Sequence, residues 1–260
     1  MSGCILCKIP RAREPYYMDC ISTNLYSMEE LCYVLDKNIY LIDQDVINED
    51  LIFWLRDQLG RTLLAQRLLS LKEKQNASLW EMLSLLFQEI NYFSHAERRT
   101  FENKIKALER EDFLHRNKKK ADTLAENGMY VKAIEIYLSL LASPQLQEQT
   151  GLLGSVYHNM GCVYSYLFQK EEALRYFEKA YQLLHTGEAI KSYLYAFYMA
   201  KTPIEYASKL SELGVDEATA REVKEEIEKV ENADRPVIPT QQVDEILSDM
   251  MKGYHRSVGA

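Results

Sequence analysis

The chain has 260 residues, of which 47% are hydrophobic, and its 39 Asp and Glu outnumber 31 Lys and Arg to give a formal net charge of -8. This acidic balance argues against general affinity for nucleic acid or anionic membranes, because both favour clustered Lys and Arg. The hydrophobic content is ample for one large or two ordinary domains. With 6 prolines and 10 glycines, helices are permitted nearly throughout, so we expect an all-α fold.

The sequence favours a cytoplasmic protein that does not enter a membrane. No stretch approaches the roughly 20 apolar residues that a membrane-spanning helix needs. The apolar part of residues 1–8 is too short for a signal peptide, and Lys8, Arg11 and Arg13 follow it instead of preceding it. Five cysteines, an odd number, fit a reducing compartment better than a disulfide framework.

Residues 1–26 are expected to form an extended N-terminal arm. Pro10 and Pro15 disfavour helix, and a β-prone run that includes Tyr16 and Tyr17 follows them. Since these two tyrosines would otherwise face water, we expect the arm to lie across the helices that come next.

Residues 27–111 are expected to form an N-terminal helical region. Its helix starts are marked by residues that cap helix N-termini, namely Ser27, Asn48, Ser78 and Ser94. Gly60 separates two leucine-rich helices, the second of which includes Leu63, Leu64 and Leu68 on its predicted apolar stripe. The helices that start after Ser78 and Ser94 should run for about 15 and 17 residues.

One helical-hairpin pattern occurs twice between residues 114 and 185. The first copy has Ala121, Leu124, Gly128, Tyr130, Ala133 and Tyr137 at relative positions 8, 11, 15, 17, 20 and 24. The second has Tyr157, Gly161, Tyr164, Phe168, Ala173, Phe177 and Ala180 at positions 4, 8, 11, 15, 20, 24 and 27. This pattern resembles the tetratricopeptide repeat (TPR), a helix–turn–helix unit whose small residues let its two helices approach closely.

The resemblance implies a TPR-like solenoid of helical hairpins over residues 112–232, with the N-terminal helices as a further layer. The two copies are 40 residues apart instead of the 34 of the family, and an extra turn or a longer loop would absorb the difference. A third, degenerate hairpin would use residues 189–200 and a helix capped by Thr202. The polar helix at 217–230 would then cap the open end of the array.

Residues 233–260 are expected to form a linker, at 235–239, and an amphipathic tail helix at 240–252. Val243 and Leu247 lie on the apolar side of this helix. The tail could fold back into the repeat groove or bind another protein, and the sequence leaves both possibilities open.

The resemblance also implies which side chains face the groove. First-helix positions 2, 5, 9 and 12 line it in the family, which selects His115, Lys118, Asp122 and Ala125, then Ser155, His158, Cys162 and Ser165. In the similar chaperone-binding TPR domains, Lys and Asn side chains grip a peptide carboxylate. Lys118 and Asn159 match that clamp, whereas Asp122 replaces an Asn and would repel an acidic peptide end.

The aromatic-rich stretch at 189–200 suggests a further binding residue, Tyr195, because tyrosines supply large contact area at low entropic cost. These tyrosines could equally form the core of the third hairpin. The predicted peptide-binding residues are Lys118, Asp122, His158, Asn159, Cys162 and Tyr195.

Few features suggest chemistry. Cys4 and Cys7 form a C-x-x-C pair that could bind zinc with Cys20 and Cys32, although ordinary thiols are the favoured interpretation. The sequence has no glycine-rich phosphate loop, nucleophile elbow or zinc-protease helix. We therefore expect no enzymatic activity, no cofactor and no metal.

The favoured function is that of an adaptor, a non-enzymatic module that binds a peptide or partner helix in a TPR groove. One alternative is a peptide-sensing regulator with a DNA-binding head over residues 27–74, although acidic residues outnumber basic ones there. Another is a self-assembling scaffold, in which the tail helix or an open end of the array docks on a second copy.

Overall fold

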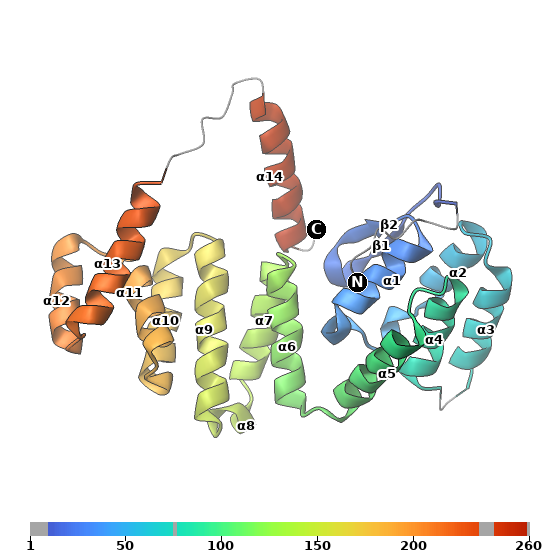
Figure 1. Ribbon diagram of the computed structural model, residues 1–260, viewed down its shortest axis with the longest axis horizontal. Helices are drawn as coiled ribbons and strands as arrows, with labels where there is room; N and C mark the ends of the chain where they lie inside the picture. The colour runs from blue at the N-terminus through green and yellow to red at the C-terminus, as the bar shows by residue number, and fades with distance from the viewer. Residues whose placement is uncertain (1–9, 75–76, 234–241, 259–260) are drawn as a thin grey trace. The chain divides into compact units, whose positions relative to one another are not determined.

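The computed structural model describes residues 10–74, 77–233 and 242–258 (Figure 1). Within these ranges the regular secondary structure is helical except for one hairpin of strands β1 (Tyr16–Met18) and β2 (Thr23–Leu25). The strands pair antiparallel, with Tyr16 opposite Leu25. The prediction of an all-α chain is confirmed at this level.

The contacts divide the chain into two compact units, Met1–Thr123 and Leu124–Val258. The division falls inside helix α6 (Phe113–Glu126) and therefore inside the first predicted repeat.

The first unit contains the hairpin, five complete helices and most of α6. The complete helices are α1 (Met28–Lys37), α2 (Glu49–Asp57), α3 (Thr62–Lys72), α4 (Leu79–Glu89) and α5 (His95–Arg110). Four of these helices are N-capped by the predicted residues. The side chains of Ser27, Asn48, Ser78 and Ser94 each accept a hydrogen bond from a backbone N–H in the first turn. The capping predictions are confirmed.

Two predictions for these helices are wrong in detail. Helix α4 has 11 residues, not about 15, because Asn91 adopts a left-handed conformation with φ 49° just after it. Leu63 is 73% exposed, whereas Leu64 and Leu68 are buried. Leu64 and Leu68 are four residues apart and therefore share one face of the helix. Leu63 is one position before Leu64, so its side chain points to a different side.

The N-terminal arm packs on α2. The Trp54 indole Nε1 donates a hydrogen bond to the Glu14 carbonyl oxygen at 2.9 Å, and the Tyr16 and Trp54 rings lie 5.9 Å apart. Tyr17 points to the other side of its strand and is 43% exposed. The expected packing of the arm is therefore found for Tyr16 and not for Tyr17.

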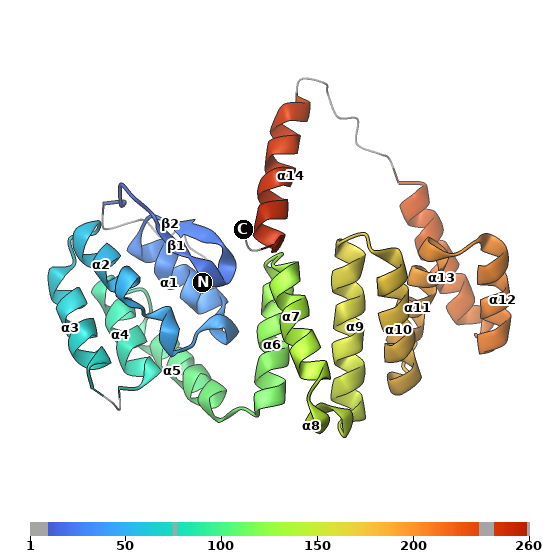
Figure 2. The ribbon, with the colours of Figure 1, turned by 180° about the vertical axis from the view of Figure 1, so that it is seen from behind.

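The second unit continues with helices in succession. They are α7 (Tyr130–Leu141), α8 (Pro144–Gln147), α9 (Thr150–Tyr166), α10 (Lys170–Leu184), α11 (Gly187–Ala200), α12 (Pro203–Leu213), α13 (Glu217–Glu231) and α14 (Val243–Val258). The insertion between the two repeat copies forms the short helix α8. Figures 1 and 2 show α9, α10 and α11 side by side in antiparallel succession.

One buried apolar cluster of this unit lies between α10 and α11. Its buried side chains are Ala173, Leu174, Phe177, Tyr193, Ala196 and Phe197. Tyr193 is thus a core residue, which was one of the two possibilities for the aromatic stretch.

In both repeat copies a residue with positive φ follows the first helix, but the residue type differs. Gly128 follows α6 with φ 76°, and Phe168 follows α9 with φ 58°. A left-handed conformation costs glycine nothing, whereas a phenylalanine side chain there crowds its own backbone.

Helix α14 begins at Val243 and ends at Val258, beyond the predicted end at 252. The predicted linker at 235–239 and residues 240–241 lie outside the described residues. Leu247 and Met250, on the apolar side of α14, are exposed. No helix in the described ranges is both long and apolar enough to cross a bilayer.

Candidate functional site

The predicted groove residues of the first copy bond to each other. The Lys118 ammonium lies 2.8 Å from the Asp122 carboxylate, one turn away on α6, and both side chains are largely buried. Each charge therefore has its counter-charge within the helix. Both residues belong to the first unit.

In the second copy, His158 joins α9 to α11. Its Nε2 atom lies 3.0 Å from the Ser192 hydroxyl oxygen on α11, and its ring packs edge-on against Phe177 at 5.3 Å. The Cys162 sulfur lies 3.9 Å from Nδ1 of the same ring. Burial raises the pKa of the Cys162 thiol, so the thiol stays protonated at neutral pH. The structure thus brings together His158 and Cys162.

The remaining predicted side chains of α9 are arranged differently. The hydroxyls of Ser155 and Ser165 donate to carbonyl oxygens one turn back, at 2.9 Å each. Asn159 is half-buried beside His158 in sequence, but successive helical residues point about 100° apart. The link from α9 to α11 therefore runs through His158, with Cys162 beside it.

Tyr195 belongs to a second row of contacts, between α11 and α13. The Lys191 ammonium lies 2.6 Å from the Glu222 carboxylate, the Tyr195 hydroxyl donates to Glu226, and the Tyr198 hydroxyl donates to Glu231 at 2.6 Å. Together with His158 and Ser192, these six residues define what we call the α9–α11–α13 face.

The two phenols of this row are hydrogen-bond donors at neutral pH. Burial, and then the neighbouring Glu226, raise the pKa of Tyr195. The hydrogen bond to Glu231 is the main cause of the raised pKa of Tyr198. Since both phenols keep their protons, each glutamate acts as the acceptor.

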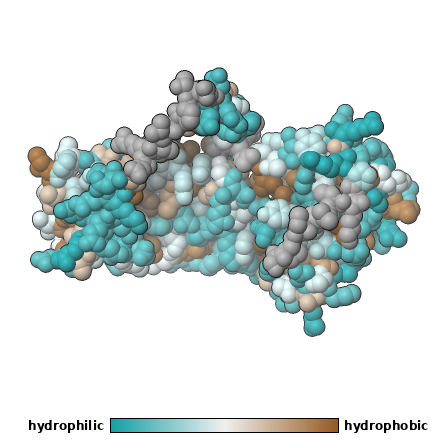
Figure 3. Space-filling model, turned by 45° about the horizontal axis from the view of Figure 1, so that its top comes forward, coloured by the Kyte–Doolittle hydropathy of each residue, from teal (hydrophilic) through white to brown (hydrophobic). Residues whose placement is uncertain are grey.

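A pocket of about 330 Å³ opens between α11 and α13. It is lined by Tyr195, Tyr198, Met199, Glu226, Ile227, Val230 and Glu231. Met199 and Val230 are 57% and 75% exposed. The side of α13 seen in Figure 3 is mainly hydrophilic.

Sequence reasoning missed the glutamates of this pocket because it assigned the last helix of the array only a capping role. The paired residues are separated by close to one repeat length. The separation is 31 positions both for Lys191 and Glu222 and for Tyr195 and Glu226. That periodicity is the signal that could have found them.

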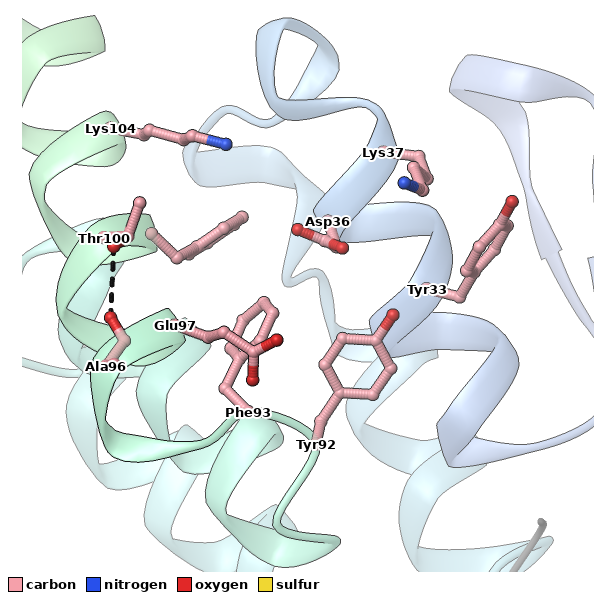
Figure 4. A pocket seen from close by; sticks show the side chains of 10 residues that line it. Tyr33, Asp36, Lys37, Tyr92, Phe93, Ala96, Glu97, Thr100 and Lys104 are labelled. Atoms are coloured by element: carbon pink, nitrogen blue, oxygen red, sulfur yellow. Dashed lines mark hydrogen bonds between the residues drawn. The ribbon is translucent and has the colours of Figure 1, made fainter. Parts of the chain in front are cut away.

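The first unit has a pocket of about 400 Å³ between α1 and α5. Figure 4 shows Tyr33 and Asp36 of α1 facing Tyr92, Phe93 and Glu97 across it. The Tyr92 hydroxyl is buried and has no hydrogen-bond partner among the described atoms. Burial is the main cause of the raised pKa of this phenol, which therefore remains neutral.

Two of the four cysteines of the possible zinc site, Cys20 and Cys32, lie among the described residues. Cys4 and Cys7 lie outside the described residues. Cys32 is fully buried, and its thiol points to the Leu86 carbonyl oxygen at 3.9 Å, while Cys20 is half-buried. Among the described residues, no three His, Cys, Asp or Glu side chains are grouped as metal ligands.

Comparison with known proteins adds no identification to this geometry. No family model, curated protein or solved structure matches the chain.

Proposed function

We propose that the second unit is a TPR-like scaffold that binds a peptide segment or partner helix on its α9–α11–α13 face. The observation that carries the proposal is the contact between His158 and Ser192. These residues are separated by 34 positions, which is one TPR length. A contact at that separation is what two equivalent positions on successive first helices would make.

The side chains on this face suit binding better than catalysis. They combine a half-buried imidazole and thiol on α9 with phenols and exposed apolar groups at the α11–α13 pocket. Aromatic and apolar groups of this kind anchor partner proteins. Asn159 of the second copy, also on α9, stays a predicted contributor. Lys118 and Asp122 of the first copy stay predicted peptide-binding residues of the first unit.

The proposal is tested by selecting a displayed random-peptide library on the full chain. We expect enriched peptides whose binding is lost in His158→Glu and in Ser192→Glu, because either change places a charge in the α9–α11 contact. Gln182→Glu, at an exposed position of α10, adds the same charge elsewhere and should retain binding. Circular dichroism must show equal helicity for all three variants.

Two outcomes would overturn the proposal. One is that no peptide is enriched. The other is that enriched peptides bind equally to the wild type and both face variants, which would place binding outside the α9–α11–α13 face.

A further inference from the structure

The geometry points to a cationic ligand at one place on this face. We infer that the α11–α13 pocket takes a Lys or Arg side chain, next to an apolar residue, from a segment of another protein. This inference rests on the proposed function and names the chemistry of its partner.

The pocket offers an apolar surface that no other part of the described chain covers fully. Met199 and Val230 leave more than half of their surface in water, and Ile227 lines the same pocket. Burying such surface is favourable by about 25 cal/mol per Å². An aliphatic side chain, or the methylene stem of Lys or Arg, would cover it.

The charges at the rim are of one sign. Both charged residues among the described side chains that line the pocket, Glu226 and Glu231, are acidic. Each carboxylate offers about four acceptor positions, and a tyrosine hydroxyl uses one of them. Acceptor capacity therefore remains for a guanidinium or ammonium group.

The two phenol rings add a second feature that favours a cation. Tyr195 and Tyr198 line the same pocket, and cations bind favourably over the faces of aromatic rings. Tyr198 also packs edge-on against Tyr206 of α12 at 5.5 Å, which restricts the orientation of its ring. A planar guanidinium can both stack on such a ring and bridge to a carboxylate.

Charge also argues that the occupant comes from another protein. The amphipathic tail helix α14 lies against α7, and its first two turns carry three acidic residues, Asp244, Glu245 and Asp249. The ammonium of Lys252, on the next turn, is paired with Asp249 at 2.9 Å. Like charges brought together across a contact are costly. A basic segment avoids this cost and is complementary to the two pocket glutamates.

The test uses the full chain and three synthetic peptides with the same central leucine, flanked by arginine, glutamine or glutamate. Fluorescence anisotropy gives the Kd of each peptide for the wild type and for two variants of equal charge. Glu226→Gln with Glu231→Gln removes the pocket charges and keeps an acceptor for each tyrosine. Glu217→Gln with Glu225→Gln neutralises two exposed glutamates elsewhere on α13.

We expect the arginine peptide to bind most tightly and to lose about three- to tenfold in affinity in the pocket variant. The control variant should bind like the wild type. It has the same net charge as the pocket variant but keeps both pocket glutamates. Raising salt from about 50 to about 300 mM should weaken the arginine peptide most.

Other results would overturn the inference in distinguishable ways. If the three peptides bind equally and His158→Glu still abolishes binding, the cationic preference is wrong and the proposed function stands. If both double variants weaken the arginine peptide alike, the attraction is general and not due to the pocket. If none of the three peptides binds while library peptides still depend on His158 and Ser192, the inference about the pocket is wrong and the proposed function stands.

Discussion

Gly161 on α9 lies directly against the ring of Phe177 on α10. A Cβ atom added to Gly161 would be 2.7 Å from Cδ1 of that ring, which is closer than real Cβ contacts come. Phe177 is buried in the core between α10 and α11 and cannot move away freely. The close approach of α9 and α10 therefore requires a residue without a side chain at this position.

Gly161→Ala should lower the free energy of unfolding by about 1–3 kcal/mol, because the added methyl group overfills the contact. Gly151→Ala is the matched control, since Gly151 is exposed near the start of the same helix and a Cβ atom added there would meet no atom within 4 Å. There alanine should be neutral or stabilising by up to about 1 kcal/mol, through helix propensity. Urea unfolding gives both values, and equal effects would contradict the close contact.

Phe168→Gly should stabilise the chain by about 0.5–1 kcal/mol. Its φ of 58° is unfavourable for a residue with a Cβ, and its ring is 85% exposed and contributes little packing. Gly128→Ala, at the equivalent turn of the first copy, should destabilise by about 1–2 kcal/mol. Thermal or urea unfolding of the two variants should therefore shift in opposite directions, and a loss of stability in Phe168→Gly would show that the ring has a structural role.

Removing the Tyr92 hydroxyl should cost no stability. Because it is buried without a partner among the described atoms, Tyr92→Phe should be neutral or raise the free energy of unfolding by up to about 1 kcal/mol. Tyr16→Phe is the contrasting variant, since the Tyr16 hydroxyl exchanges hydrogen bonds with Asn48, and it should cost about 1 kcal/mol. If Tyr92→Phe were the more harmful of the two, the hydroxyl would have to be bonded in solution.

Stability should fall in acid through the carboxylates that cap α12 and α13. Hydrogen bonds from Thr202 lower the pKa of Glu205, and those from Thr219 lower the pKa of Asp216. A carboxyl whose folded pKa lies below its unfolded pKa stabilises the fold above the unfolded value, about 4, and loses that contribution as pH falls through the folded value. Denaturation midpoints between pH 7 and pH 2 should therefore decrease, and less steeply in Glu205→Gln with Asp216→Asn. An unchanged slope would mean that these caps do not contribute.

Local features of the fold were predictable from sequence and long-range ones were not. The Ser78–Glu81 and Thr202–Glu205 capping boxes involve residues three positions apart, so the pattern contains the whole interaction. The exposure of Leu63 depends on where neighbouring helices lie, which a leucine-rich stretch does not reveal. The β1–β2 hairpin was expected only as an extended arm, because its pairing depends on the turn between the strands.

The site was predictable to a similar extent. His158 and Cys162 followed from the repeat positions, because those positions fix which side of the helix they occupy. The partners of Tyr195 and Tyr198, Glu226 and Glu231, lie 31 and 33 residues away on a helix whose composition indicates only a polar surface. Their contact depends on how α13 packs against α11, which the local pattern does not contain.

Site-specific photo-crosslinking tests most directly the claim that a basic segment binds at the α11–α13 pocket. A photoreactive amino acid replaces Met199 in one full-length protein and Leu63, which is exposed on α3, in another. The account predicts that the arginine-flanked peptide crosslinks at position 199 and not at 63, and that unlabelled peptide competes for it. A peptide that binds with the same affinity and crosslinks equally at both positions, or at neither, would contradict the account.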